Sequence, residues 1–395
     1  MKRAYNTLTL ARQSARKVRV VIVAPYGQQT MGGQATFATR LADQAARRVD
    51  VVRLVIPQRR ERYRLSRIVC SARLACRLVW LLLRRRVDVV HVFSPCSRMA
   101  LFEKLVLTGI ARALGAKTIL NFRNGLDQWS QYWGRLERRI VVALIRVNTI
   151  VLCQYRALAE YLVAEGMVGR EQVRVVANGL PAAELIPHRS TGHGAARTRI
   201  VFLGSVGIRK GVDLLVHAAR LLDARAGRPF VVEIVGPADN GREIRAIERS
   251  AQPLVAKGGL KFRGPISPGE RRELLGGADI FVLFSRAEGL PNSLLEAMGA
   301  SLPVVVSDRG AMPEVVESGV EGLVVAAEDA AQLADALGTL IDDPQLRRQM
   351  GRRARQRVES HYALEQVVSE FCHLYENLHA PRVRQHTTCQ RSRCA

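Results

Sequence analysis

The sequence has few acidic residues, few aromatic residues and little lysine. It holds 35 Asp and Glu against 60 Lys and Arg, only seven of the basic residues are lysine, and aromatic residues make up 5%. The seven cysteines are scattered without a C-x-x-C pair, so the sequence indicates neither a zinc site nor a disulfide framework. It has no uncharged apolar run of the length that a membrane-spanning helix needs. Residues 1–17 lack the apolar core of a secretory signal. We therefore expect a cytoplasmic protein.

Apolar and basic residues are abundant instead. Apolar residues form 48% of the 395-residue chain, enough for a large core and, at this length, for more than one domain. The basic excess lies in residues 1–195, which hold 33 basic and 11 acidic side chains, whereas residues 196–395 hold 27 and 24. The first half is therefore expected to bind an anionic partner. The charge alone does not distinguish nucleic acid, an anionic membrane and a phosphorylated substrate.

The order of apolar runs predicts an α/β protein with two doubly wound parallel sheets. β-Branched runs typical of strands buried on both faces alternate with longer helical patterns. Gly-rich and polar residues around 180–197 indicate the boundary between the two series, and a helical pattern fills 331–378. We predict a flexible basic N-terminus (1–17), a first domain (18–190), a second domain (191–380) and a disordered basic tail (381–395). The expected strands are 18–24, 51–56, 87–93, 118–122, 149–153 and 173–177, then 200–203, 230–235, 261–262, 280–284, 303–306 and 322–325.

The strongest motif is a pair of carboxylates, Glu288 and Glu296, separated by a Gly/Pro turn directly after a predicted strand. We expect Glu288 on the loop and Glu296 in the first turn of the next helix, where free N–H groups favour an anionic or hydroxyl-rich ligand. An alternative for Glu296 is a capping box with Ser293.

Two glycine-containing turns add weaker signals. Arg209 and Lys210 follow a Gly-x-x-x-x turn just before a helix, where they could clamp a diphosphate or simply be solvated. Gly32 and Gly33 lie between the first strand and its helix, where backbone without side chains can approach a phosphate; the alternative is that they serve only the turn.

Taken together, these motifs resemble the retaining nucleotide-sugar glycosyltransferases of family 4, also called group 1, which have the GT-B fold. The resemblance rests on Glu288-x7-Glu296, on Gly204-x4-Arg209-Lys210-Gly211, on Asn178-Gly179 and on Gly32-Gly33, in the family's order. It implies two Rossmann-like domains that face a cleft, with the acceptor on the first domain, the nucleotide-sugar on the second, and a C-terminal helix that returns toward the first domain. It also implies transfer with retention by same-face attack, without a bound metal or other cofactor.

The resemblance assigns roles residue by residue. Glu296 would hold the ribose hydroxyls, Glu288 the transferred sugar, and Arg209 with Lys210 the diphosphate. The backbone of the loop after Glu288 and the Gly32-Gly33 turn would line the sugar and the phosphates. The expected donor-binding residues are Gly32, Gly33, Ser205, Arg209, Lys210, Glu288, Gly289, Leu290, Pro291, Asn292 and Glu296.

The sequence departs from the family pattern at two positions. Ser205 stands where many relatives have arginine, and we expect Arg209 to replace that cation. Arg123 and Asn124 follow a strand where many relatives have histidine, so both are acceptor-side candidates, and Arg123 could face the diphosphate instead. His91, expected at the end of a strand, is a further candidate, although a histidine bonded inside the strand layer is at least as plausible.

The segment Arg59–Arg86 holds ten arginines and one acidic residue, and its apolar residues Leu65, Ile68, Val69, Ala72, Cys76, Val79 and Leu83 recur at helical spacing. It could cover the sheet, dock on anionic lipid on the inner face of the plasma membrane, or both.

We expect a glycosyltransferase with a glycan or lipid-linked acceptor in cell-surface polysaccharide, exopolysaccharide or lipopolysaccharide synthesis. The alternative is another GT-B enzyme, an epimerase or a sugar-phosphate synthase. A nucleic-acid-binding protein accounts for the charge but lacks any base-reading motif, so we expect no nucleic-acid partner.

Overall fold

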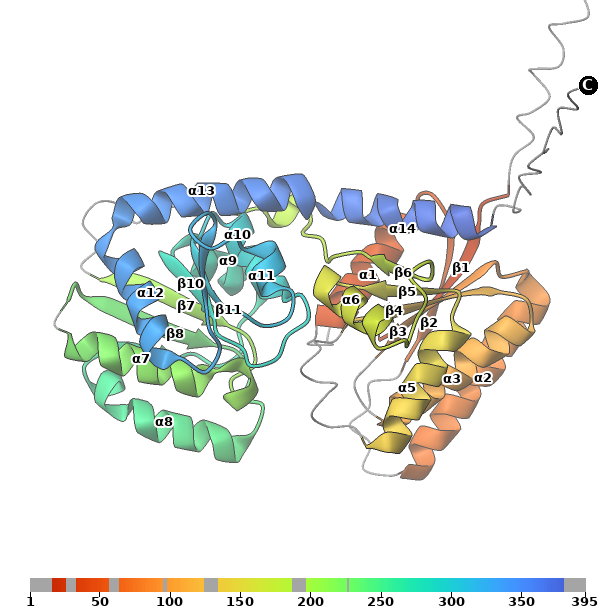
Figure 1. The fold of residues 1–395 in the computed structure, drawn as a ribbon, viewed down its shortest axis with the longest axis horizontal. Coiled ribbons are helices and arrows are strands. Elements are labelled where there is room, and N and C mark those ends of the chain that lie inside the picture. The colour runs from red at the N-terminus through yellow and green to blue at the C-terminus, as the bar shows by residue number, and fades with distance from the viewer. Residues whose placement is uncertain are drawn as a thin grey trace, which may run out of the picture.

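Two parallel β-sheets dominate the computed structural model, which describes residues 16–25, 33–56, 64–94, 98–123, 134–186, 197–225 and 227–379. Each sheet has six strands, ordered β2-β1-β3-β4-β5-β6 and β12-β11-β10-β7-β8-β9. Figure 1 shows the two sheets side by side with helices on both faces. The predicted α/β class with two doubly wound sheets is confirmed.

The first sheet forms from β-branched runs that are buried on both faces. In β1 (Arg19–Ala24), Val20 to Ala24 have no exposed surface, as expected for a central strand between two helical layers. The other strands of this sheet are β2 (Asp50–Val55), β3 (Val89–Ser94), β4 (Lys117–Phe122), β5 (Ile150–Cys153) and β6 (Val173–Val175). Its helices are α1 (Gly33–Ala45), α2 (Arg64–Arg85), α3 (Arg98–Ala113), α5 (Arg135–Val147) and α6 (Arg156–Ala164).

The second sheet follows the short helix η1 (Ala182–Glu184) and repeats the same plan. Its strands are β7 (Thr198–Leu203), β8 (Phe230–Val235), β9 (Leu260–Phe262), β10 (Ile280–Leu283), β11 (Val304–Ser307) and β12 (Gly322–Val325). The helices between them are η2 (Ile208–Lys210), α7 (Val212–Ala224), α8 (Gly241–Ala256), α9 (Pro268–Gly276), α10 (Asn292–Gly299) and α11 (Met312–Val315). Each predicted strand begins and ends within three residues of the observed strand.

The predicted helical stretch 331–378 consists of three helices, α12 (Ala330–Asp342), α13 (Pro344–His361) and α14 (Leu364–His379). The first break follows from Pro344, which has no N–H and therefore starts a helix more easily than it continues one. The Asp343 carboxylate caps α13 by accepting from the backbone N–H groups of Gln345 and Leu346, each at 2.9 Å.

The last two helices run along one side of both sheets and so connect the two halves (Figure 1). α13 packs against α10 of the second half, and α14 packs against α1 and β3 of the first. Between them, Leu180 and the start of α14 exchange backbone hydrogen bonds, from Leu180 N to Tyr362 O (2.8 Å) and from Leu364 N to Leu180 O (3.0 Å). The two segments that connect the halves, one at Leu180 and the other at Tyr362 to Leu364, therefore lie side by side. The expected return of a C-terminal helix to the first half is confirmed.

Helix α2 has two apolar faces rather than one. Leu74, Leu78, Leu81 and Leu82 are buried against the first sheet, whereas Ile68, Val69 and Leu83 are 56%, 43% and 68% exposed. The apolar stripe predicted from the sequence is therefore largely the outward one, and a second stripe covers the sheet. No helix in the described ranges is long and apolar enough to cross a bilayer.

Candidate functional site

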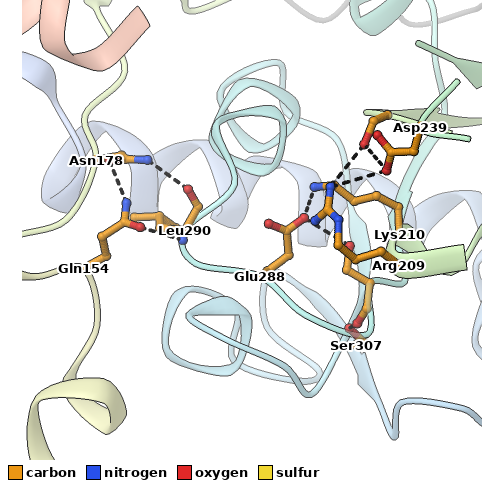
Figure 2. A network of polar contacts seen from close by, with 10 residues as sticks. Gln154, Asn178, Arg209, Lys210, Asp239, Glu288, Leu290 and Ser307 are labelled. Carbon is orange, nitrogen blue, oxygen red and sulfur yellow. Dashed lines mark hydrogen bonds and ion pairs between the residues drawn. The ribbon is translucent and has the colours of Figure 1, made fainter. Parts of the chain in front are cut away.

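The loop after β10 carries Glu288, which is only 8% exposed. Its carboxylate pairs with the ammonium group of Lys210 and accepts a hydrogen bond from Ser285 Oγ at 3.2 Å. Ser307, at the end of β11, supports this loop by donating to Ser285 O at 2.6 Å. Figure 2 shows the Glu288 carboxylate directed at Lys210. The loops after β7 and β10 therefore meet at the carboxyl edge of the sheet, where open α/β folds bind ligands.

The turn after β7 carries Ser205, Arg209 and Lys210. Ser205 Oγ donates to Asp239 Oδ2 at 2.9 Å and accepts from Arg209 Nη2 at 3.2 Å, while Arg209 lies 3.6 Å from the same carboxylate. The Arg209 side chain is 43% exposed and the Lys210 side chain 13%. The structure thus brings together Lys210 and Glu288 as a buried pair and leaves Arg209 at the solvent-exposed rim.

Gly211 lets helix α7 begin close to β10. Its φ is +67°, and a Cβ there would lie 1.8 Å from Phe284 O, so no larger residue fits without moving the backbone. As the N-cap of α7 it also has no side chain to occupy the first N–H groups of this 13-residue helix. These groups lie beside Lys210, so the positive end of the helix dipole and the Lys210 ammonium charge act at the same place.

Glu296 does not lie where the sequence predicted. Helix α10 begins at Asn292 with Pro291 as N-cap and no side-chain cap, so Glu296 is in the second turn. Both the first-turn placement and the capping box with Ser293 are therefore wrong. The carboxylate instead accepts from Arg271 Nη1 of α9, at 3.0 and 3.1 Å, and is 6% exposed. Burial raises the pKa of Glu296, and the Arg271 charge opposes that shift.

Amide side chains join the two halves across the site. Asn178, which follows β6, donates to Leu290 O at 2.9 Å and to Asn292 Oδ1 at 2.8 Å, and Asn292 Nδ2 donates to Gly33 O at 3.3 Å. A Cβ on Gly289 would come within 2.5 Å of Gln154 Oε1 and 2.7 Å of Arg123 O. The loop 289–292 therefore rests directly on the first half, and Gly289 permits this approach.

Sequence reasoning missed Gln154, which follows β5 and is 4% exposed. In one orientation of its amide, Nε2 donates to Asn178 Oδ1 at 2.9 Å, as Figure 2 shows. In the other orientation, Nε2 donates to Arg123 O at 2.9 Å and Oε1 accepts from Arg123 Nη2 at 3.0 Å. Its place after a buried strand, on the same sheet edge as Arg123 and Asn178, was the available signal.

The acceptor-side candidates separate into two places. Arg123 follows β4 and lies at the sheet edge near Gly289, with its guanidinium carbon 3.9 Å from the Phe37 ring centre. His91 is in the middle of β3 rather than at its end, which corrects its predicted position. Its ring is fully buried, with Nδ1 2.7 Å from Tyr375 Oη of α14 and Nε2 3.2 Å from Asn121 Nδ2. His91 thus belongs to the core under α14, while Asn124 and Gly32 lie outside the described residues.

No group of three or more His, Cys, Asp and Glu side chains within the described ranges is placed to hold a metal ion.

Residues 187–357 match the family model described as "Glycosyl transferases group 1". This part of the chain is therefore similar to the group 1 glycosyltransferases. The matched residues include Glu288, Glu296, Arg209 and Lys210, so the loops after β7 and β10 lie within the matched segment. Arg123, Gln154 and Asn178 lie outside it.

Curated proteins match the chain over a similar or longer part. The chain is 30% identical over 231 residues to D-inositol 3-phosphate glycosyltransferase of Nocardia farcinica, covering 55% of this chain and 49% of that protein. It is 31% identical over 195 residues to the lipopolysaccharide core biosynthesis mannosyltransferase LpsB of Rhizobium meliloti, covering 48% and 54%. The chain therefore spans about half the length of these relatives.

The fold is that of solved GT-B structures. Anabaena Alr3699/HepE in complex with UDP-glucose aligns with a TM-score of 0.74 at 17% identity, covering 91% of this chain and 99% of that one. Sucrose-phosphate synthase of Thermosynechococcus elongatus aligns with a TM-score of 0.75 at 18% identity, covering 92% and 99%. The predicted GT-B fold is thereby confirmed over nearly the whole chain.

Proposed function

We propose that this protein is a retaining, metal-independent glycosyltransferase that moves a sugar from a nucleotide-sugar donor to a glycan or lipid-linked acceptor. The observation that carries the proposal is the buried contact of Lys210 with Glu288, which brings together the loops after β7 and β10 inside the group 1 glycosyltransferase segment. A cation and a carboxylate at one sheet edge can bind the two parts of a nucleotide-sugar: the cation its diphosphate and the carboxylate its sugar hydroxyls.

The donor diphosphate would lie at the start of α7. Arg209 and Lys210 come just before this helix, and Gly211 as N-cap makes no side-chain hydrogen bond to its N-terminal N–H groups. Helix N-termini and cations both stabilise developing negative charge on a leaving phosphate, which is the work that a metal does in other transferases. This arrangement supports transfer without a metal.

The two carboxylates would hold the sugar and the ribose. Glu288 can accept hydrogen bonds from sugar hydroxyls while Lys210 and Ser285 keep it oriented. Glu296 has further lone pairs beyond those that face Arg271, so it can accept from ribose hydroxyls while paired. Each carboxylate is thus fixed by a cation before the donor arrives, which lowers the entropy cost of binding.

In the transfer step, the bond from the anomeric carbon to the diphosphate oxygen breaks as the bond to the acceptor oxygen forms on the same face. The leaving phosphate oxygen takes the proton of the acceptor hydroxyl. The cations near α7 would stabilise the charge on the leaving group. Retention and same-face attack follow from the family resemblance.

We further propose that the acceptor is presented at an anionic membrane surface, in the synthesis of a cell-surface polysaccharide, an exopolysaccharide or a lipopolysaccharide. Helices α2, α3 and α5 lie together on the first half (Figure 1). They carry large apolar side chains that are 39–68% exposed: Ile68, Val69, Trp80 and Leu83, then Phe102 and Val106, and Leu136. Arg84 and Arg85 are in the last turn of α2, and the combination of exposed apolar and cationic groups suits binding to anionic lipid.

A sugar-phosphate synthase is a second candidate. It is favoured by the 31% identity over 227 residues to alpha-maltose-1-phosphate synthase of Mycolicibacterium smegmatis. Such an enzyme would use the same donor site and differ only in the acceptor.

The experiment is a panel of UDP- and GDP-sugars, incubated with the protein and either membrane extract or sugar phosphates, with the products analysed by mass spectrometry and NMR. The proposal expects a new glycosidic bond to a component of the extract, of unchanged anomeric configuration, in the presence of a chelator. A phosphorylated product would favour the second candidate, and an isomerised donor without transfer would contradict both.

A further inference from the structure

Arg123 differs from the other cations near Glu288 and Glu296 because no carboxylate in the described ranges pairs with it. Lys210 pairs with Glu288, Arg209 lies beside Asp239, and Arg271 pairs with Glu296. Within the part of the chain that the structure describes, Arg123 forms no ion pair, and its Nη1 is buried without a hydrogen-bond partner. Among the described residues, no acidic side chain neutralises the charge of Arg123.

The position of Arg123 is fixed by packing. The residue is 6% exposed, and its guanidinium carbon lies 3.9 Å from the ring centre of Phe37 and 5.6 Å from that of Phe93. In the orientation in which Gln154 Nε2 donates to Arg123 O, its Oε1 also accepts from the guanidinium group. Two aromatic rings and an amide thus hold the guanidinium group in one place. Burial lowers the pKa of Arg123 to about 9, which leaves it charged at neutral pH.

The place that Arg123 occupies is the edge where a substrate would enter. It follows β4 at the carboxyl end of the first sheet, and its backbone touches the loop position Gly289, one residue after Glu288. Leaving a buried charged donor unsatisfied costs free energy. A bound anion that faces Nη1 would remove this cost.

We propose that Arg123 binds an anionic oxygen, of a phosphate or a carboxylate group, on one of the two substrates that occupy the cleft. The proposal rests on the proposed transferase function for the identity of these substrates. The anion can come from the donor, through its diphosphate, or from the acceptor, through an acidic group. In either case the first half supplies a charge-assisted hydrogen bond beside the loop that carries Glu288.

The test compares the full-length protein with Arg123→Gln and Arg123→Lys by calorimetry. The matched control is Arg138→Gln, because the Arg138 side chain is 60% exposed and pairs only with Glu165 among the described residues. Thermal unfolding of each variant shows whether the fold is retained. A lysine keeps the charge without the planar group, so Arg123→Lys should retain part of the binding that Arg123→Gln loses.

The first arm measures the binding of UDP and GDP. If the anion belongs to the donor, Arg123→Gln weakens the binding of UDP or GDP by about 10- to 100-fold, as expected for the loss of a charged hydrogen bond. The second arm measures inorganic phosphate binding to protein saturated with UDP or GDP. If the anion belongs to the acceptor, Arg123→Gln loses phosphate binding in this arm and keeps its nucleotide affinity.

The proposal is overturned if Arg123→Gln folds and binds both probes as tightly as the wild type and the Arg138→Gln control. If the wild type binds neither UDP nor GDP but its phosphate binding depends on Arg123, the anion site stands and the transferase proposal fails.

Discussion

His91 makes the stability of this protein depend on pH in a defined window. Its ring is fully buried between Phe93 and Phe371, and its nitrogens contact Tyr375 and Asn121. Burial, together with the positive charge of Arg123, lowers the pKa of His91 from 6.5 to about 3. The folded protein therefore holds a neutral imidazole under α14 at pH values where the unfolded chain binds a proton.

The sign follows from proton binding. Because His91 has the higher pKa in the unfolded state, acidification below about pH 6.5 favours unfolding. The loss of stability continues until the pH nears 3. Between pH 7.5 and pH 5, these two pKa values correspond to a loss of about 2 kcal/mol in the free energy of unfolding. Other titrating groups add their own terms, so the variant His91→Gln is needed to isolate this one.

The assay is urea unfolding followed by tryptophan fluorescence at several pH values. We expect the stability of His91→Gln to change by about 2 kcal/mol less than that of the wild type between pH 7.5 and pH 5. His373→Gln is the matched control, because His373 lies on α14 with its side chain 62% exposed. Parallel pH profiles for the wild type and His91→Gln would refute the reasoning, even if the variant were less stable at every pH.

Two further predictions concern the cleft and the outer helices. Asn178→Ala removes the hydrogen bonds to Leu290 O and Asn292 and leaves buried partners unpaired, so we expect the donor KM to rise roughly 10-fold and the thermal stability to fall modestly; an unchanged KM in the folded variant would show that these bonds do not position the loop. The wild type should sediment with phosphatidylglycerol vesicles at low salt and dissociate at high salt, and the variant Leu83→Ser/Leu136→Ser should bind less than the control Val255→Ser on α8; indifference to anionic lipid would contradict the membrane proposal.

The sequence was sufficient to predict the strands and the site loops because their signals are local. Val20 to Ala24 are an apolar run that can only be a buried strand or a short buried helix segment, and the following turn decides between them. Lys210 and Glu288 each follow such a strand, so their common sheet edge could be inferred. The break at Pro344 was also local and was missed, although an Asp-Pro pair is a typical helix start.

The remaining features depend on contacts between distant residues. His91 is bonded to a tyrosine 284 positions later, which no local pattern reveals. Glu296 takes its partner from the neighbouring helix α9, so the sequence offered Ser293 as the nearer explanation. For α2, two apolar stripes were available, and only the packing of the helix shows that Leu74 and Leu78 face the sheet while Leu83 faces outward.

The central claim is that Glu288 and Lys210 act on a bound nucleotide-sugar. The most direct measurement is the rate of nucleoside diphosphate release, with donor and membrane extract, by the wild type, Glu288→Gln and Lys210→Met. The control is Arg225→Gln, at the end of α7, where the side chain is 47% exposed. We expect both site variants to lose roughly 100- to 1000-fold in kcat while remaining folded, since each loses an electrostatic contact to the reacting groups. Wild-type rates in folded Glu288→Gln and Lys210→Met would contradict it.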